Sequence, residues 1–295
     1  MDFFSTLLSQ LVNGLQSGSI YALVALGYSM VYGIILLLNF AHGDIIMVGA
    51  YAAWYSLVKW ELPVAVCIIF SILVSTALGV LIERIAYRPL RKAPRLSLLI
   101  TAIGVSFFLE NGAQLVFGAN SQVVPTFLTG PSIQIGDVRL SFTAIVTIVT
   151  ALIYMAILTF LVQKTKMGKA MRAVSEDMGA AQLMGINVNS VISFTFAIGS
   201  ALAGIGAILY LCAYPQVGPF MGSMLGLKAF VAAVLGGIGS IPGAMLGGFA
   251  IGIAESLVTA MGLSQWKDGV VFAILIVVLI LRPTGFMGKK IVEKV

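Results

Sequence analysis

Residues 141–162 read SFTAIVTIVTALIYMAILTFLV, an apolar run that contains no Asp, Glu, Lys or Arg. Residues 62–82 and 191–212 form two more uncharged runs of similar length. An α-helix needs about 20 residues to cross the roughly 30 Å hydrocarbon core of a membrane. A β-barrel strand needs only about 10 residues and alternates polar with apolar side chains, which these runs do not. The three runs therefore predict transmembrane helices, whose backbone groups are hydrogen-bonded within the segment.

The composition of the whole chain agrees with a membrane protein. Of its 295 residues 60% are hydrophobic and 9% are charged, and the mean hydropathy is +1.07, whereas soluble domains carry about 25% charged residues. These values exclude an ordinary cytosolic enzyme, a nucleic-acid-binding protein and a disordered chain. Cys67 and Cys212 lie inside apolar runs and predict neither a disulfide nor a metal site. We expect an all-α polytopic membrane protein with one transmembrane domain over residues 1–295.

Further apolar runs raise the expected number of transmembrane helices to about eight or nine. The predicted spans are residues 20–39, 43–58, 62–82, 97–117, 141–162, 191–212, 225–240, 243–261 and 265–281. Because 43–58 and 225–240 are short, each is a half-helix, a re-entrant segment or a full crossing. Residues 1–18 repeat apolar side chains at helical spacing and predict an amphipathic segment at the membrane interface. The polar residues 118–140 form the longest predicted external loop.

The basic residues predict how the chain is oriented. Most of the 17 Lys and Arg residues fall into three clusters, within residues 84–95, 164–172 and 282–294. Short loops rich in Lys and Arg remain on the cytoplasmic side of a membrane. We therefore expect all three clusters and the tail 282–295 to be cytoplasmic, and the N-terminus to be outside. The cluster at 84–95 also predicts contact with anionic lipid or a secondary contact with a partner protein.

Two stretches of similar chemistry are compatible with two related halves. Residues 39–54 read NFAHGDIIMVGAYAAW and residues 236–255 read GGIGSIPGAMLGGFAIGIAE, so in each a glycine-containing break precedes a helix with small residues. Paired broken helices are common in transporters, but coincidence among glycine-rich segments explains the pattern equally well. Glycines four apart allow either tight helix packing or a moving interface. The predicted packing or hinge residues are Gly236, Gly237, Gly239, Gly243 and Gly247.

Residues 164–190 read KTKMGKAMRAVSEDMGAAQLMGINVNS, which is too polar for a transmembrane span. Their apolar residues recur at helical spacing and predict a short amphipathic helix, or a pair of helices, on the cytoplasmic face. Gly185, followed by Ile186 and Asn187, predicts the C-terminal end of the helix. An apolar stripe on such a segment needs the groove of another protein, because the chain has no obvious soluble mass to cover it.

The run Ala180-Ala181-x-x-x-Gly185 is similar to the core of the coupling motif of ABC-importer permeases, the helix that docks on the ATPase subunit. Gly179 stands where the general motif has Glu, while acids stand nearby. The resemblance implies an ATPase-coupling role for Glu176, Asp177, Ala180, Ala181 and Gly185.

Longer strings resemble one family more closely. MGKAMRAVSEDMGAAQLMGINV, LNFAHGDIIMVGAYAAW and VLGGIGSIPGAMLGG are similar to the branched-chain amino-acid ABC transporter permease family, first permease subunit. The resemblance implies a multi-pass protein of the bacterial inner membrane that works with a second homologous permease or a second copy of itself. It also implies two cytoplasmic ATPase subunits and a periplasmic substrate-binding protein.

The chain contains no G-x-x-x-x-G-K-[ST] motif, the phosphate-binding loop of many ATPases. We therefore expect ATP on the partner subunits, no cofactor on this chain and no enzymatic activity of its own. A urea or short-amide ABC permease is an alternative, because that family is closely similar. An ATP-independent channel or proton-coupled carrier is a second alternative. An intramembrane enzyme is a third, although neither a nucleophile–base pair nor a metal-ligand cluster is visible.

Several polar residues fall at or near membrane depth, where a charge costs about 3 kcal/mol or more. Such groups usually face a cavity or a partner, so they predict either the translocation pathway or contacts that lock helices. The alternative is that they hydrogen-bond neighbouring backbone at broken helices, or, for His42 and Asp44, cap a helix at the interface. The candidate residues are Asn39, His42, Asp44, Glu110, Asn111 and Glu255.

Overall fold

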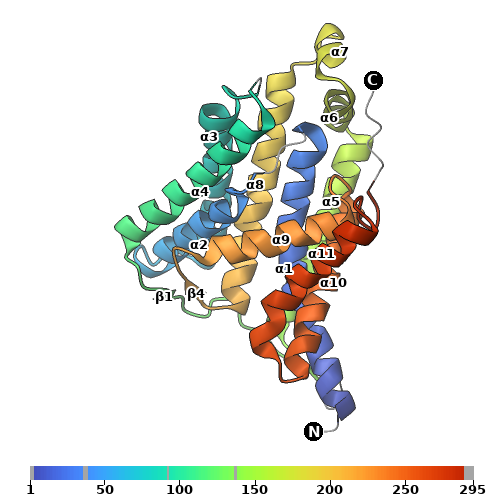
Figure 1. Ribbon diagram of the computed structural model, residues 1–295. Helices are drawn as coiled ribbons and strands as arrows, with labels where there is room; N and C mark the ends of the chain where they lie inside the picture. Colours follow the sequence, from blue (N-terminus) through green and yellow to red (C-terminus); the bar gives the residue numbers. More distant parts are fainter. Residues whose placement is uncertain (1–2, 36–38, 92, 136–137, 289–295) are drawn as a thin grey trace.

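The computed structural model describes residues 3–35, 39–91, 93–135 and 138–288 (Figure 1). Within these residues the helices are α1 (Phe3–Ile35), α2 (His42–Val58), α3 (Val64–Ile82), the π-helix η1 (Glu83–Tyr87), α4 (Arg95–Phe117), α5 (Phe142–Lys164), α6 (Lys166–Glu176), α7 (Met178–Leu183), α8 (Val188–Ala213), α9 (Met221–Gly236), α10 (Ile241–Ala260), the 3₁₀ helix η2 (Ser264–Trp266) and α11 (Lys267–Leu281). The short strands are β1 (Gln122–Val123), β2 (Ile133–Ile135), β3 (Val138–Leu140) and β4 (Gln216–Val217). The prediction of an all-α polytopic membrane protein is confirmed.

Seven helices in the described part of the chain are long and apolar enough to cross a membrane. Helices α2 and α9 are shorter, with 17 and 16 residues. Helix α2 begins at His42, whose ring lies against Tyr28 in the middle of α1 with the ring centroids 4.9 Å apart. The start of α2 therefore lies beside α1 and not beyond its end.

The predicted limits of two segments differ from the structure. Helix α9 ends at Gly236 instead of continuing to residue 240, because Gly237 has a φ of 101° that a right-handed helix does not allow. Helix α1 is continuous for 33 residues, so the predicted boundary at residue 18 is absent from it. At 1.5 Å per residue α1 is about 50 Å long, which exceeds the roughly 30 Å of hydrocarbon. Residues 1–2 lie outside the described part.

Glycine explains why α1 continues past that boundary. A Cβ placed on Gly14 would lie 2.9 Å from the carbonyl oxygen of Gly252, and one on Gly18 would lie 2.8 Å from the carbonyl oxygen of Gly248. The first turns of α1 therefore pack directly on the backbone of α10. Close approach of small residues is the usual way in which helices associate in lipid, where the hydrophobic effect does not drive helices together.

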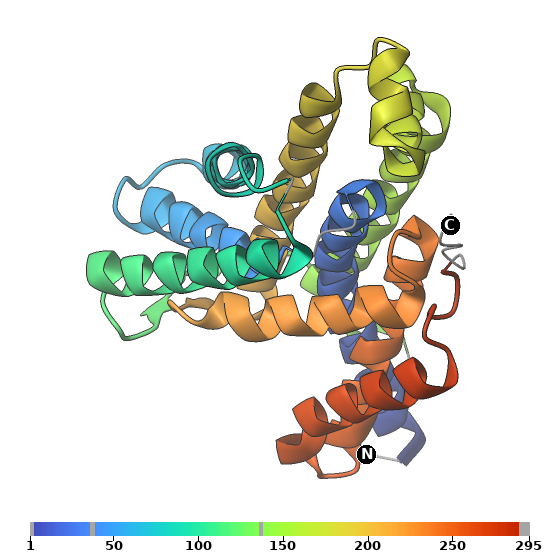
Figure 2. The same cartoon turned by 45° about the horizontal axis from the view of Figure 1, so that its top comes forward.

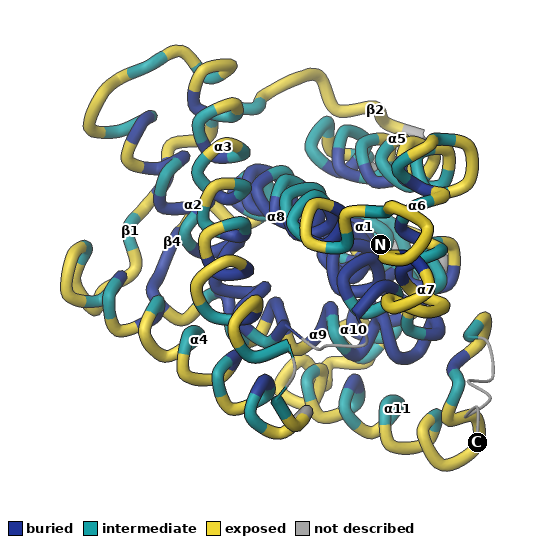
Figure 3. The backbone as a smooth tube through the Cα atoms, turned by 90° about the horizontal axis from the view of Figure 1, so that it is seen from above, coloured by how far each residue is buried: buried dark blue, intermediate teal, exposed yellow. Residues whose placement is uncertain are grey.

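The core of the molecule lies between α1, α2, α8, α9 and α10, whereas α4, α5 and α11 carry more exposed residues (Figure 3). Residues 18–31 of α1 are all buried. Large apolar side chains on α4, such as Phe108 and Leu115, are exposed. Exposed apolar side chains of this kind suit contact with lipid or with another membrane subunit.

The two ends of the molecule differ. Helices α6 and α7 project from one end, and the N-terminal end of α1 lies at the other (Figures 1 and 2). The antiparallel strands β1 and β4 join the loop at 118–140 to the loop before α9, with Gln122 opposite Val217. Trp54 near the end of α2 donates a hydrogen bond to the carbonyl oxygen of Val123, 3.2 Å away. The predicted loop 118–140 thus holds short strands, including the β2–β3 hairpin.

Candidate functional site

The segment 164–190 forms a pair of helices. The side chain of Thr165 caps α6 by accepting a hydrogen bond from the backbone N–H of Gly168, at 3.0 Å. Met171 and Val174 on one face of α6 are buried in the core, where α6 packs near α1, α5 and α8. The predicted helical segment is confirmed. The expectation that its apolar stripe needs the groove of another protein is wrong for α6, because this face packs on other helices of the same chain.

Acidic residues separate the two helices. Asp177 is the N-cap of α7, because its Oδ1 accepts hydrogen bonds from the backbone N–H groups of Gly179 at 2.8 Å and Ala180 at 2.9 Å. Such a cap contributes about 1 kcal/mol to helix stability. Glu176 is the last residue of α6 and is exposed. The structure therefore gives Asp177 a part in shaping the segment, while the coupling role of both acids stays a prediction.

Helix α7 ends where the sequence predicts. Gly185 has a φ of 82°, its N–H donates to the carbonyl oxygen of Gln182 at 3.1 Å, and the N–H of Ile186 donates to that of Ala181 at 3.0 Å. These two bonds form a Schellman motif, which needs a left-handed residue and therefore favours Gly. Ala181 is buried and Ala180 is exposed.

Just before that turn, two apolar side chains at the end of α7 are left exposed by the described part of the chain. Leu183 is 89% exposed and Met184 is 83% exposed. Helix α7 projects from the end of the molecule (Figure 2).

Three helices bring polar side chains together around α9. Ser106 on α4 donates a hydrogen bond to Oδ2 of Asp44 on α2, at 2.5 Å, and Ser223 on α9 donates to Oε1 of Glu110. Ser106 and Glu110 lie one turn apart on α4. The carboxylate of Asp44, which contacts Ser106, therefore lies on the same side of α4 as the carboxylate of Glu110. Asp44 and Glu110, which are far apart in sequence, are therefore neighbours in one buried cluster.

The remaining residues near α2 have other contacts. Asn39 accepts a hydrogen bond from the hydroxyl of Tyr87 at 2.8 Å. His42 is buried against Tyr28. Asn111 is exposed and donates to the carbonyl oxygen of Phe107 on its own helix, at 2.7 Å.

Neither His42 nor Asp44 is the N-cap of α2, so the capping part of the alternative is wrong. Ala41 occupies the N-cap position of α2, and both side chains are buried in the core. Asp44 instead reaches Ser106 on a different helix.

Glu255 belongs to a second cluster that joins four helices. Its Oε1 lies 2.7 Å from Nζ of Lys228 on α9, and its Oε2 accepts a hydrogen bond from the hydroxyl of Tyr21 on α1 at 2.8 Å. Lys228 also lies 2.7 Å from Oδ1 of Asp268 on α11 and 5.7 Å from the ring centroid of Tyr21. A cation held between two carboxylates and a ring ties α1, α9, α10 and α11 together.

The predicted glycine positions lie where α9 turns back into α10. Gly236 and Gly243 are so close that a Cβ on either would overlap the other's carbonyl group, and Gly247 is equally close to Ala232. Gly237 and Gly239 have φ angles of 101° and 90°, which suit glycine. The structure thus shows a tight turn and close packing here, and whether this turn moves stays a prediction.

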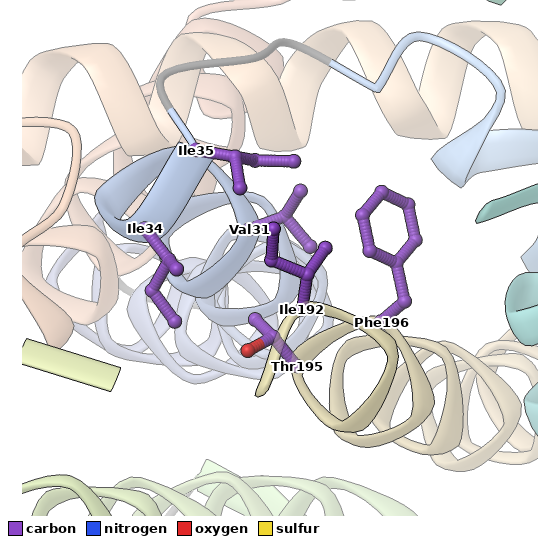
Figure 4. A pocket seen from close by; sticks show the side chains of 6 residues that line it. All are labelled: Val31, Ile34, Ile35, Ile192, Thr195 and Phe196. Atoms are coloured by element: carbon purple, nitrogen blue, oxygen red, sulfur yellow. The ribbon is translucent and has the colours of Figure 1, made fainter. Parts of the chain in front are cut away.

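A small apolar hollow lies between α1 and α8 (Figure 4). The residues that line it are Val31, Ile34 and Ile35 of α1 and Ile192, Thr195 and Phe196 of α8. The hydroxyl of Thr195 donates to the carbonyl oxygen of Val191 on its own helix, at 2.8 Å. The hollow is much smaller than a ligand site, so it does not by itself provide a passage for a solute.

A family model described as branched-chain amino acid transport system, permease component, matches residues 10–279. The match covers nearly all of the transmembrane helices described above. The chain belongs to this family. It is therefore a multi-pass membrane protein and a transport permease, and the sequence-based prediction of the family is confirmed.

Relatives of known function support this membership over their whole length. The high-affinity branched-chain amino acid transport system permease protein BraD of Pseudomonas aeruginosa is 45% identical over 98% of both chains. The permease LivH of Escherichia coli K12, described in the same words, is 44% identical over 99% of both chains. The ribose import permease RbsC of Haemophilus influenzae is 25% identical over 98% of this chain and 88% of its own. The comparison with solved structures gave no match.

The sequence did not predict a role for several residues with buried polar contacts. Lys228 stands alone in an apolar run, and that isolation in a membrane segment was a usable signal. Ser106 and Ser223 gave no signal, because serine is common in transmembrane helices. Glu83 and Tyr87 also have buried polar contacts. They were not predicted because they lie in or beside a cluster of basic residues, which indicated an exposed segment.

Proposed function

We propose that this chain is a permease subunit of an ABC importer that moves branched-chain amino acids across a bacterial inner membrane. The observation that carries the proposal is the similarity to two permeases of that substrate class. They are 45% and 44% identical to this chain over nearly its whole length. The ribose permease is much less similar. Branched-chain amino acids are therefore favoured over sugars as the substrate.

The basic residues support a cytoplasmic position for α6 and α7. Lys164, Lys166, Lys169 and Arg172 lie in or beside α6, and Arg91 of the first cluster hydrogen-bonds to Asn189 at the start of α8. The described end of the chain, at Gly288, lies against Gly237 in the turn between α9 and α10. Lys289, Lys290 and Lys294 of the third cluster fall outside the described residues. Under the positive-inside rule this end faces the cytoplasm and the N-terminus faces outside.

In this arrangement α7 is the docking helix for an ATPase. Leu183 and Met184 supply the apolar contact that a groove in the partner requires. The complete importer contains this chain, a second homologous permease or a second copy of this one, two ATPase subunits and a periplasmic binding protein. ATP is bound and hydrolysed on the ATPase subunits, and this chain binds no cofactor and catalyses no reaction itself.

The substrate and the energy source are tested together in proteoliposomes. The chain is reconstituted with the partner subunits encoded by its gene neighbours, and uptake of leucine, isoleucine, valine and urea is measured with and without ATP. We expect uptake of the three amino acids, dependent on ATP and on the binding protein. Equal uptake by this chain alone without ATP would identify a channel or carrier, and uptake of urea alone would overturn the substrate assignment.

Docking is tested on the exposed side chains of α7. We expect Leu183→Asp to prevent co-purification of the ATPases and to reduce ATP-dependent uptake to background. Loss of a central interface side chain costs about 2 kcal/mol or more, roughly 30-fold in affinity. Because Leu183 is exposed, folding of the chain is expected to be unchanged.

Leu263→Asp is the matched control, because Leu263 is exposed after the C-terminal end of α10, far in the chain from α7. The control is expected to retain both co-purification and uptake. Normal co-purification of the ATPases with the Leu183→Asp variant would show that α7 is not the docking helix.

A further inference from the structure

The end of α3 carries a buried acid that the transport site does not explain. Glu83 is fully buried and is the first residue of the π-helix η1, in which the N–H of Arg88 donates to the carbonyl oxygen of Glu83 at 2.7 Å. Single turns of π-helix inside α-helices are rare and occur often at functional sites. The carboxylate of Glu83 points toward α8, so its contacts indicate the role of this π-helical turn.

Glu83 is held by groups from two directions. Arg91 forms an ion pair with its Oε1, and Ser193 on α8 donates a hydrogen bond to its Oε2 at 2.6 Å. A second nitrogen of Arg91 donates to Oδ1 of Asn189, at 2.7 Å. Asn189 and Ser193 lie one turn apart on α8. We call Glu83, Arg91, Asn189 and Ser193 the Glu83 joint, because they attach the segment after α3 to the first turns of α8.

The same turns of α8 follow α7 directly. Only residues 184–187 separate the two helices, and hydrogen bonds hold this connection at both ends. Ile186 donates to Ala181 of α7, and the side chain of Asn187 accepts from the N–H of Ser190 at 3.1 Å. Because the connection is short and hydrogen-bonded at both ends, a displacement of α7 is expected to displace the start of α8 as well.

On its other side the joint is connected to the residues just before α2. Tyr87, the last residue of η1, donates a hydrogen bond to Oδ1 of Asn39, and its ring lies against Phe196 of α8 with centroids 5.6 Å apart. The carbonyl oxygen of Asn39 in turn accepts from the N–H of His42, the first residue of α2, at 2.9 Å. A continuous series of contacts thus runs from α7 through the joint to the start of α2.

We propose that the Glu83 joint passes the movement of α7 to α2, and that Glu83 and Arg91 are positioning residues for transport. This inference rests on the proposed function, in which an ATPase moves α7. It assigns a mechanical role to charges that lie outside the glycine turn and outside both polar clusters around α9. Arg91 suits the task because its planar guanidinium binds Glu83 and Asn189 through separate nitrogens.

The test measures uptake and ATP hydrolysis by the assembled importer in proteoliposomes. We expect Glu83→Gln and Arg91→Gln each to reduce ATP-dependent amino-acid uptake by about tenfold or more, within the usual range of coupling between sites. ATPase co-purification and the rate of ATP hydrolysis are expected to stay near those of the unaltered complex. Arg91→Lys keeps one charge toward Glu83 and is expected to restore part of the uptake.

Arg84→Gln is the matched control, because Arg84 belongs to the same basic cluster and is exposed. It is expected to transport normally. Uptake within twofold of normal in the Glu83→Gln variant would overturn the joint. A parallel fall of uptake, ATP hydrolysis and thermal stability would also overturn it, because that result would mean that Glu83 only stabilises the fold. Failure of the docking assignment is read separately, from co-purification with the Leu183→Asp variant.

Discussion

Replacing Gly252 with Val is expected to prevent this chain from accumulating as folded protein in the membrane. A Cβ on Gly252 would overlap the carbonyl oxygen of Gly14 and the backbone of Gly18 on α1, neither of which can move like a flexible side chain. Overpacking a core usually costs 1–3 kcal/mol. Here the added atoms meet backbone along a whole seam, so we expect a loss above about 4 kcal/mol.

The seam matters because α1 and α10 form the most extensive helix–helix contact among the described residues. Gly248 repeats the contact one turn earlier, where a Cβ would lie 2.5 Å from the Cα of Ala22. In lipid, helices associate through van der Waals packing and hydrogen bonds, and both need short distances. Separating the helices at Gly252 also disturbs Glu255, which lies three residues later on α10 and bonds to Tyr21 of α1.

The matched control is Gly112→Val on α4, where a Cβ would meet nothing within 4 Å in this chain. Both variants are expressed without partner subunits, and the fraction of monodisperse protein is measured after extraction in detergent. We expect Gly112→Val to behave like the unaltered chain and Gly252→Ala to fall between the two Val variants. Equal yields of folded protein for the two Val variants would contradict the seam.

The sequence predicted well whatever depends on local composition. The runs at 62–82, 141–162 and 191–212 became α3, α5 and α8, because a helix in lipid satisfies its backbone by itself. The helix end at Gly185 was also predictable, since a left-handed residue is a local requirement. Asp177 gave a signal that the coupling motif obscured, because an acid just before a short helix is a typical N-cap.

What the sequence did not predict depends on which helices meet. Gly14 and Gly18 lie four residues apart, a spacing that allows tight helix packing, but only the fold shows that Gly248 and Gly252 form the opposite face. Residues 1–18 were predicted to form a separate interfacial segment because their apolar side chains recur at helical spacing between polar ones. That argument ignores the packing on α10 that keeps them in the same helix.

The polar clusters show the same limit. Glu110 and Asp44 were candidates for one pathway, and the fold places them together through Ser106 and Ser223. Glu255 was included in the same set, yet its partners are Tyr21, Lys228 and Asp268. No pattern along the chain separates these two groups, since the separation arises from the crossing of α4, α9 and α10.

Replacing Lys228 with Met is expected to destabilise the protein by about 3–5 kcal/mol, the usual cost of removing one partner from a buried ion pair. Met fills nearly the same volume, so the loss comes from charge and not from a cavity. Glu255 would remain 9% exposed without the cation that neutralises it, whereas Asp268, at 39%, can still be hydrated. The measurement is unfolding in mixed micelles with increasing sodium dodecyl sulfate.

Lys267→Met is the matched control, since Lys267 is exposed and next to Asp268. Surface changes of this kind usually alter stability by less than about 0.5 kcal/mol. The double variant Lys228→Met with Glu255→Gln removes the buried carboxylate charge as well, and it is expected to regain much of the lost stability. If the double variant is no more stable than Lys228→Met alone, the uncompensated charge of Glu255 is not the cause. The four helices would then be held together by packing instead of by this cluster.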